Sequence, residues 1–392
     1  MGIRVFLLAR FILVIAAQIQ TIVTGWQVYE ATHSTFNLGL VGLAVFLPYM
    51  ISMPLAGDAS DRFNRGKIVG ISSIFLGLLI AAQGVWISHN PSNILGTIFI
   101  LAGIGVARAF GSAAGGSMIA LLVPKENLMK YITLNTAVWN ASCVIGPVVG
   151  GFLYSEVGPV STLWIASSGA LLSSLVFLGL KVRTIEADNT ESRVVRVMAG
   201  FKYIWREKEI LGAISLDLFA VLFGGAMALL PVYAKDILHV GPDGFGLLRS
   251  ATALGSIPTA LWFARRPINK DPGRKLFFAV YVFGFAMIGF GLSTYFWLSF
   301  TFLALSGAAD VVSVYIRHGL LQLRVSEEMR GRVTAVNQIF IGASNELGEF
   351  ESGMAATLFG PVAAVVGGGF ITILCVFFCK KLFPKLANLE QV

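Results

Sequence analysis

Several carboxylates stand inside stretches of the sequence that are otherwise apolar. They are Asp217, Asp310, Glu346 and Glu349. An ionisable group inside a membrane is costly, so it marks an ion or substrate path by default. Glu346 and Glu349 are three residues apart and share one face of a helix, whereas Glu351 points elsewhere. Two acids that close together titrate as a pair. We therefore predict that these four carboxylates carry protons.

Single arginines occur in the same kind of apolar stretch. Arg108 lies far inside one, and Arg317 follows Asp310 by seven residues, on the same helix face. A buried guanidinium binds an anionic group or pairs with a carboxylate. The alternative is a set of salt bridges that only hold helices together, with Arg10 and Arg317 near the membrane edges as the first cases. The residues predicted to bind substrate are Arg10, Gln18, Arg108, Asn140 and Arg317.

The composition decides which elements position these side chains. The chain has 392 residues, of which 56% are hydrophobic and 13% charged, whereas a soluble domain carries about 25% charged residues. A membrane-spanning helix needs roughly 20 mostly apolar residues. We therefore predict an all-α polytopic membrane protein with twelve spans, at 5–29, 36–57, 67–88, 93–116, 127–154, 160–181, 209–234, 243–263, 275–293, 296–320, 332–356 and 360–383.

The net charge of +8 reports the orientation of these spans. An even number of spans puts both termini on one side. Of the 29 Lys and Arg residues, Lys235 is the one in a loop of the opposite side, and Arg108, Arg249 and Arg317 fall inside spans. Positive charge stays cytoplasmic. We therefore expect a bacterial inner-membrane protein with both termini in the cytoplasm, in contact with membrane lipids, and no nucleic-acid partner.

The sequence repeats itself at an offset of 202 residues. "VPKENLMKYITLN" from Val123 corresponds to "VSEEMRGRVTAVN" from Val325. An offset near half the length predicts two parallel six-helix halves, with the substrate path between them. The matched pairs include Glu126 and Glu328, Lys130 and Arg332, Asn135 and Asn337, Gly146 and Gly348, and Gly151 and Gly353. We predict an N-terminal half at 1–181, a cytoplasmic linker at 182–208 and a C-terminal half at 209–392.

The linker has two parts. "KVRTIEADNTESR" is polar and reads as a solvated segment. The following "VVRVMAGFKYIWREKE" sets Val197, Phe201, Ile204 and Trp205 at helical spacing against basic residues. That pattern predicts a short helix lying on the membrane surface.

A dense group of charges, "GDASDRFNRGK", separates two of the predicted spans. Gly57 permits close helix approach, and Asp61 can pair with a basic partner or accept hydrogen bonds from a helix N-terminus. With Arg62 and Arg65, the stretch resembles the loop signature of the major facilitator superfamily, whose fold the whole chain resembles. The resemblance implies a cytoplasmic latch between the halves. Asn64 departs from the usual glycine, and the alternative role is a charged turn that only fixes topology.

A second motif is "GPVVGG", comprising Gly146, Pro147, Gly150 and Gly151 with two valines. Pro147 removes a backbone hydrogen bond and bends the helix, while the glycines admit a neighbouring helix. The motif resembles the antiporter signature of the same superfamily, in the branch of bacterial drug and siderophore exporters of the enterobactin type. Arg108 likewise resembles the buried arginine of the family's fourth helix. Ordinary small-residue packing is the alternative.

The sequence lacks the marks of an ATPase or an enzyme. No GxxxxGK[ST] loop is present, and the four His residues show no metal-ligand or hydrolase spacing. We expect no cofactor and no metal, so transport must draw on an ion gradient. The expected function is proton-coupled export of an amphipathic small molecule, a siderophore or a drug, by a monomer working through alternating access. Uptake of a nutrient or metal complex is one alternative, and a non-transporting receptor or scaffold is another.

Overall fold

A computed structural model describes residues 2–180, 193–268 and 270–390. Over those residues the chain is helical, with no strand. The long helices are α1 (Gly2–Thr32), α2 (Thr35–Arg62), α3 (Arg65–His89), α4 (Ile94–Leu122), α5 (Leu128–Gly179), α6 (Arg193–Arg206), α7 (Lys208–Gly224), α9 (Pro242–Arg265), α10 (Pro272–Leu292), α11 (Phe296–Arg324), α12 (Glu327–Phe359) and α13 (Pro361–Leu382).

Short helical segments complete the order. They are η1 (Lys125–Asn127), η2 (Met227–Leu229), α8 (Leu230–Val232), η3 (Tyr233–Ile237) and α14 (Pro384–Ala387). The chain divides into two compact units. Unit 1 comprises residues 1–188 and 239–250, and unit 2 comprises 189–238 and 251–392. The boundaries predicted at 181 and 209 stay a prediction.

The predicted spans correspond to these helices. Among the described residues, nine helices are long and apolar enough to cross a membrane. One of them, α5, has 52 residues, which is about 78 Å and far more than one crossing needs. Its backbone breaks at Gly158, where φ is +77°, so it makes two crossings. With the more polar α9 and α12, of 24 and 33 residues, the total is the predicted twelve.

Three helices of unit 1 begin at side-chain caps. Ser34 accepts a hydrogen bond from the backbone N–H of Asn37, and Asn93 accepts one from that of Leu95. Asn64, the residue that departs from the family's loop pattern, accepts from the N–H of Lys67 at 3.2 Å. Such caps satisfy donors that a helix start leaves free. Asn64 therefore has a local role, which is to start α3.

Glycines let the helices of each unit approach to backbone contact. Within unit 1, a side chain at Gly105 of α4 would clash with the Val45 carbonyl of α2. Within unit 2, a side chain at Gly307 of α11 would clash with the Thr252 carbonyl of α9. These two glycines are 202 residues apart, so the sequence repeat is also a repeat of helix packing.

Another pair of glycines matched by the internal repeat, Gly146 and Gly348, also packs against equivalent helices in the two units. Gly146 of α5 packs against Gln18 of α1, and Gly348 of α12 packs against the carbonyls of Val221 and Leu222 of α7. In both units the fifth crossing therefore lies on the first.

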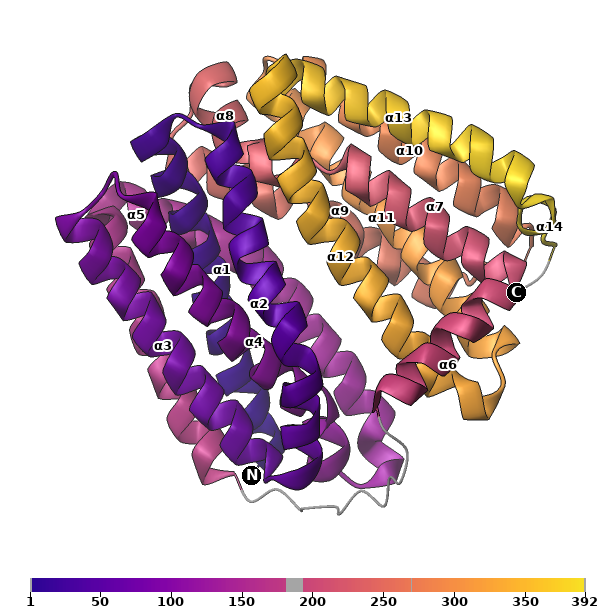
Figure 1. Cartoon of the computed structure of the whole chain (residues 1–392), viewed down its shortest axis with the longest axis horizontal. Coiled ribbons are helices and arrows are strands. Elements are labelled where there is room, and N and C mark those ends of the chain that lie inside the picture. The colour runs from indigo at the N-terminus through magenta and orange to yellow at the C-terminus, as the bar shows by residue number, and fades with distance from the viewer. Residues whose placement is uncertain (1, 181–192, 269, 391–392) are drawn as a thin grey trace. The chain divides into compact units, whose positions relative to one another are not determined.

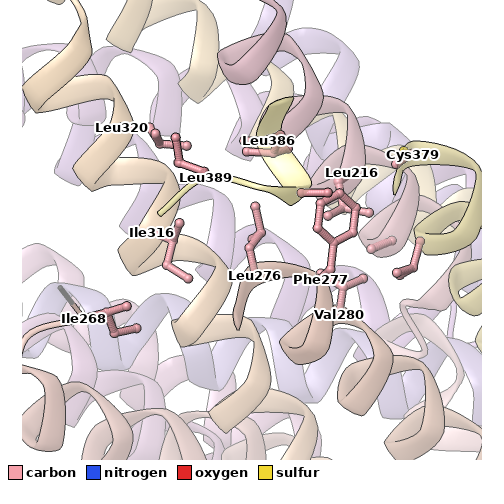
Figure 2. Packing of buried hydrophobic residues seen from close by; sticks show 14 residues of the cluster. Leu216, Ile268, Leu276, Phe277, Val280, Ile316, Leu320, Cys379, Leu386 and Leu389 are labelled. Carbon is pink, nitrogen blue, oxygen red and sulfur yellow. The ribbon is translucent and has the colours of Figure 1, made fainter. Parts of the chain in front are cut away.

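The core of unit 2 is closed at one end by the C-terminal segment. Leu386 and Leu389 are buried against Leu276 and Phe277 of α10 and Ile316 of α11 (Figure 2). Backbone bonds hold the segment in place, because the Asp271 N–H donates to the Glu390 carbonyl at 3.0 Å. In unit 2, α10 also runs beside α13 (Figure 1).

The helix predicted after the linker exists as α6, and part of its apolar surface packs against protein. Val197, Phe201 and Ile204 pack in one cluster with Val333 and Val336 of α12. A side chain at Gly200 would lie 2.6 Å from the Arg332 carbonyl, so α6 touches the backbone of α12. The position of α6 on the membrane surface stays a prediction. Trp205, at 70% exposure, lies outside the packed surface, and the segment "KVRTIEADNTES" lies outside the described residues.

Candidate functional site

In unit 1, Arg108 of α4 faces α1. Its guanidinium lies 3.5 Å from the Gln20 side-chain oxygen and 3.4 Å from the Thr21 hydroxyl. Arg108 is half-buried, whereas Gln20 is almost fully buried. These contacts put a cationic group near the middle of two membrane-spanning helices.

A network of amides fixes the oxygen that faces Arg108. The Gln20 amide N–H₂ donates to Thr24 at 2.9 Å and to the side-chain oxygen of Gln83, on α3, at 3.1 Å. Gln83 in turn donates to the Thr24 hydroxyl, and that hydroxyl donates to the Gln20 carbonyl. Both amide hydrogens of Gln20 are used, so only its oxygen can point to Arg108. Gln20, Thr24 and Gln83 were not predicted, because uncharged polar residues in an apolar run carry no distinctive spacing.

The other residues of unit 1 predicted to bind substrate lie on α1 and α5. Arg10 is half-buried, and its Nε has no hydrogen-bond partner among the described residues. A side chain at Gly115 would come within 3.4 Å of its guanidinium, so this glycine makes room for it. Gln18 donates to the Cys143 sulfur at 3.2 Å. Asn140 lies three residues before Cys143 and is half-buried.

The "GPVVGG" motif packs closely on two sides within unit 1. A side chain at Gly150 would lie 3.1 Å from the Ile19 Cα of α1. One at Gly151 would clash with the Pro242 carbonyl, in the segment 239–250, and Gly246 there faces the Pro147 carbonyl. A side chain at Gly151 or Gly246 would force the backbone apart, whereas one at Gly150 would need a smaller shift of α1.

The charges between α2 and α3 form short-range pairs. Asp61 and Arg65 lie 3.6 Å apart and are partly buried, and the Arg65 side chain also donates to the Ser60 carbonyl at 3.1 Å. Arg62 pairs with Asp58 at 3.0 Å in an exposed position. Gly57 is buried on α2. Water screens the exposed pair of Arg62 and Asp58, so that pair contributes little stability. The partly buried pair of Asp61 and Arg65 is screened less, so its interaction energy is the larger of the two.

In unit 2 the acidic and basic residues meet inside the helix bundle. Asp217 of α7 and Arg317 of α11 form an ion pair, and both are buried. Ser313 donates to the Asp217 carboxylate at 3.3 Å. Asp310 lines the same small cavity as Asp217 and Ser313. Two acids and one arginine therefore share a buried space. Arg317, at 2% exposure, is engaged by Asp217, and its role in substrate binding stays a prediction.

Glu346 and Glu349 lie on α12 and are half-buried. The face of α12 that carries Gly348 and Ser352 packs on the end of α7, where Ser352 donates to the Gly225 carbonyl at 2.6 Å. Glu346 stands at neither three nor four residues from Gly348 or Ser352, whereas Glu349 precedes Ser352 by three and therefore borders the packed face.

The fold and the charges inside its helices define a multi-pass membrane transporter built of two helical units. Residues 6–349 match the model of the Major Facilitator Superfamily, and the chain belongs to that family. The family makes the chain a transporter of a small molecule rather than an enzyme.

Curated relatives and solved structures agree with this assignment. The enterobactin exporters EntS of Citrobacter koseri and Escherichia coli (strain K12) are each 26% identical over 400 residues, covering 99% of this chain and 93% of the relative. The Gram-negative source of these relatives implies an inner-membrane protein.

Among solved structures, an inward-facing bacterial homologue of the lysosomal transporter Spinster has a TM-score of 0.78 at 14% identity, covering 98% and 97% of the two chains. A D-xylose–proton symporter has 0.76 at 15%, covering 99% of each. At these identities the structures show the fold alone.

Proposed function

We propose that this protein is a proton-coupled secondary transporter that exports an amphipathic small molecule by alternating access. The observation that carries the direction of transport is the similarity to enterobactin exporters over nearly the whole length of the chain. Their name favours a siderophore over a drug as the substrate. The "GPVVGG" motif supports the same direction through its resemblance to the antiporter signature.

Proton coupling needs a carboxyl group that is ionised in one state and protonated in another. The buried space in unit 2 supports this. Asp217 and Asp310 carry two negative charges against the one positive charge of Arg317, so the group is neutral only when one acid holds a proton. Burying a net charge is costly, which favours binding of that proton. Glu346 and Glu349 remain the first candidates for the proton carrier, because two acids three residues apart on one helix face would titrate as a pair. Asp310 is the next candidate, because Arg317 already pairs with Asp217.

Arg108 is the proposed partner for an anionic group of the substrate. It keeps partial exposure while Gln20 and Thr21 hold it. The network of Gln20, Thr24 and Gln83 then acts as a positioning group, which keeps the Gln20 oxygen aimed at the guanidinium. In the proposed orientation both termini are cytoplasmic, and the working form is a monomer.

The test measures substrate and protons together. Purified protein receives enterobactin across a series of pH values, and proton release and binding are monitored in parallel. We expect Glu346→Gln or Glu349→Gln to abolish proton release and proton-driven transport while binding persists. Glu351→Gln, on the same helix but on another face, is the matched control and should behave like wild type.

Each alternative predicts a different result. If both Gln variants release protons like wild type, the carrier lies elsewhere and Asp310→Asn is tested next. Accumulation of substrate by right-side-out vesicles under an inward proton gradient would support uptake and contradict export. A receptor or scaffold would show no flux at all, and neutralising its buried charges would leave its activity intact.

A further inference from the structure

A groove on unit 2 lies between the end of α9, the start of α10 and the middle of α11. Its volume is about 560 Å³, in the range of sites that hold organic ligands. All of its lining residues belong to unit 2. None of the residues already assigned to substrate or protons lines it, so the groove needs a separate explanation.

Each wall of the groove repeats one pattern. On α9, Thr259, Trp262 and Arg266 follow at helical spacing, and the basic residue lies just beyond the helix end. On α10, Lys275, Phe278 and Val282 also follow at helical spacing, and here the basic residue comes first, near the start of the helix. The two cations therefore stand at one end of the groove and the apolar side chains extend from them towards the middle of the helices.

The floor is made of short side chains. Ala308 and Ala309 of α11 line the groove, next to Gly307, which brings α11 against α9. Trp262 is 58% exposed and Phe278 is 68% exposed, so both walls present aromatic surface outward. A flexible hydrocarbon chain fits such an open, apolar channel better than a rigid polar ligand does.

The charged end is organised for an anion. The Arg266 guanidinium lies over the Trp262 ring, 4.9 Å from its centroid, which holds the cation at the mouth. Among the residues that the structure describes, no acidic side chain lines the groove. Arg265 at the end of α9, Lys270 in the connecting loop and Arg274 at the start of α10 add basic residues nearby in the sequence, against one acid, Asp271. Basic pockets between membrane helices bind phosphate headgroups.

We infer that this groove is a binding site for an anionic phospholipid. The phosphate lies between Arg266 and Lys275, and one acyl chain follows Trp262 and Phe278 over Ala308. With the orientation proposed above, the lipid belongs to the cytoplasmic leaflet. The inference concerns the lipid environment and holds whatever substrate is transported.

The experiment is native mass spectrometry of the purified full chain, titrated with phosphatidylglycerol or with phosphatidylcholine of the same acyl chains. We expect wild type to prefer phosphatidylglycerol, and the variant R266Q/K275Q to lose about tenfold in affinity for it. The matched control is K380Q/K381Q at the end of α13, where Lys381 also lies over an aromatic ring, Phe377, at 4.4 Å but does not line the groove. The control should keep the preference.

A second variant tests the groove rather than the charge. Ala308→Phe leaves every cation in place and fills the floor, so it should weaken phosphatidylglycerol binding as well. Equal binding of both lipids to wild type would overturn the inference. An equal loss in K380Q/K381Q, or unchanged binding in Ala308→Phe, would overturn it too.

Discussion

Gly158 and Gly360 lie 202 residues apart and adopt nearly the same left-handed backbone conformation. Their φ and ψ angles are 77° and 169° in one and 86° and 157° in the other. A proline follows each glycine, and each stands between the fifth and sixth crossing of its half. The internal repeat therefore extends to the dihedral angles of the turns.

This pair predicts a cost that depends on conformation and not on space. A side chain at either glycine would meet nothing within 4 Å, but this backbone region is almost restricted to glycine, at a cost of about 1–3 kcal/mol. Gly158→Ala and Gly360→Ala should each lower the free energy of unfolding of the purified protein by that amount, which thermal unfolding detects as a lower melting temperature. Gly367→Ala, at an equally open site within α13, should not lower it. Equal stability of all three variants would contradict the prediction.

The pair of Asp217 and Arg317 predicts a strong effect from removing one partner. Breaking a buried ion pair leaves an uncompensated charge and costs about 3–5 kcal/mol. Arg317→Gln should therefore destabilise the protein far more than the double variant D217N/R317Q. The control, Arg324→Gln, breaks a more exposed pair between the same helices, Glu209–Arg324 at 3.0 Å, and should cost about 1 kcal/mol or less. Thermal unfolding in detergent measures all three. A double variant as unstable as Arg317→Gln, or less stable, would refute a coupled pair.

The proposed latch predicts a change of state without loss of folding. Asp61→Asn weakens the half-buried pair with Arg65, so it should favour the inward-open state and slow transport while membrane insertion stays normal. Spin labels across the cytoplasmic mouth report the distances. Asp58→Asn removes the exposed pair with Arg62 and should leave both distances and flux unchanged. If Asp61→Asn also leaves both unchanged, the stretch only fixes topology.

The "GPVVGG" motif predicts steric loss of efflux. Gly151→Ala puts a methyl group against the Pro242 carbonyl, and overpacking of this kind costs about 1–3 kcal/mol. Gly150→Leu should act in the same way against α1 and abolish efflux. Gly179→Ala, at an open position of α5, is the control. Wild-type efflux by a well-expressed Gly150→Leu protein would remove the motif as evidence for export.

Some of this architecture could be predicted from the sequence, and the reasons for the limits are physical. Apolar runs predicted the crossings, because bilayer thickness sets their length. The partner of Arg317 could not be predicted, since Asp217 lies 100 residues earlier and only packing brings them together. The amphipathic pattern of α6 predicted a helix correctly. It could not tell whether lipid or protein covers Phe201, because both are apolar.

The segment that closes the core of unit 2 has a consequence for the order of folding. Leu386 and Leu389 complete a cluster that includes Leu216 of α7 and Phe277 of α10, yet a ribosome adds them more than 100 residues after Phe277. Chains fold as they are made, from the N-terminus onward. During synthesis, therefore, α7, α10 and α11 enter the membrane with one end of their shared core uncovered. A nascent chain that stops before Pro384 would expose that end to the quality-control machinery of the cell.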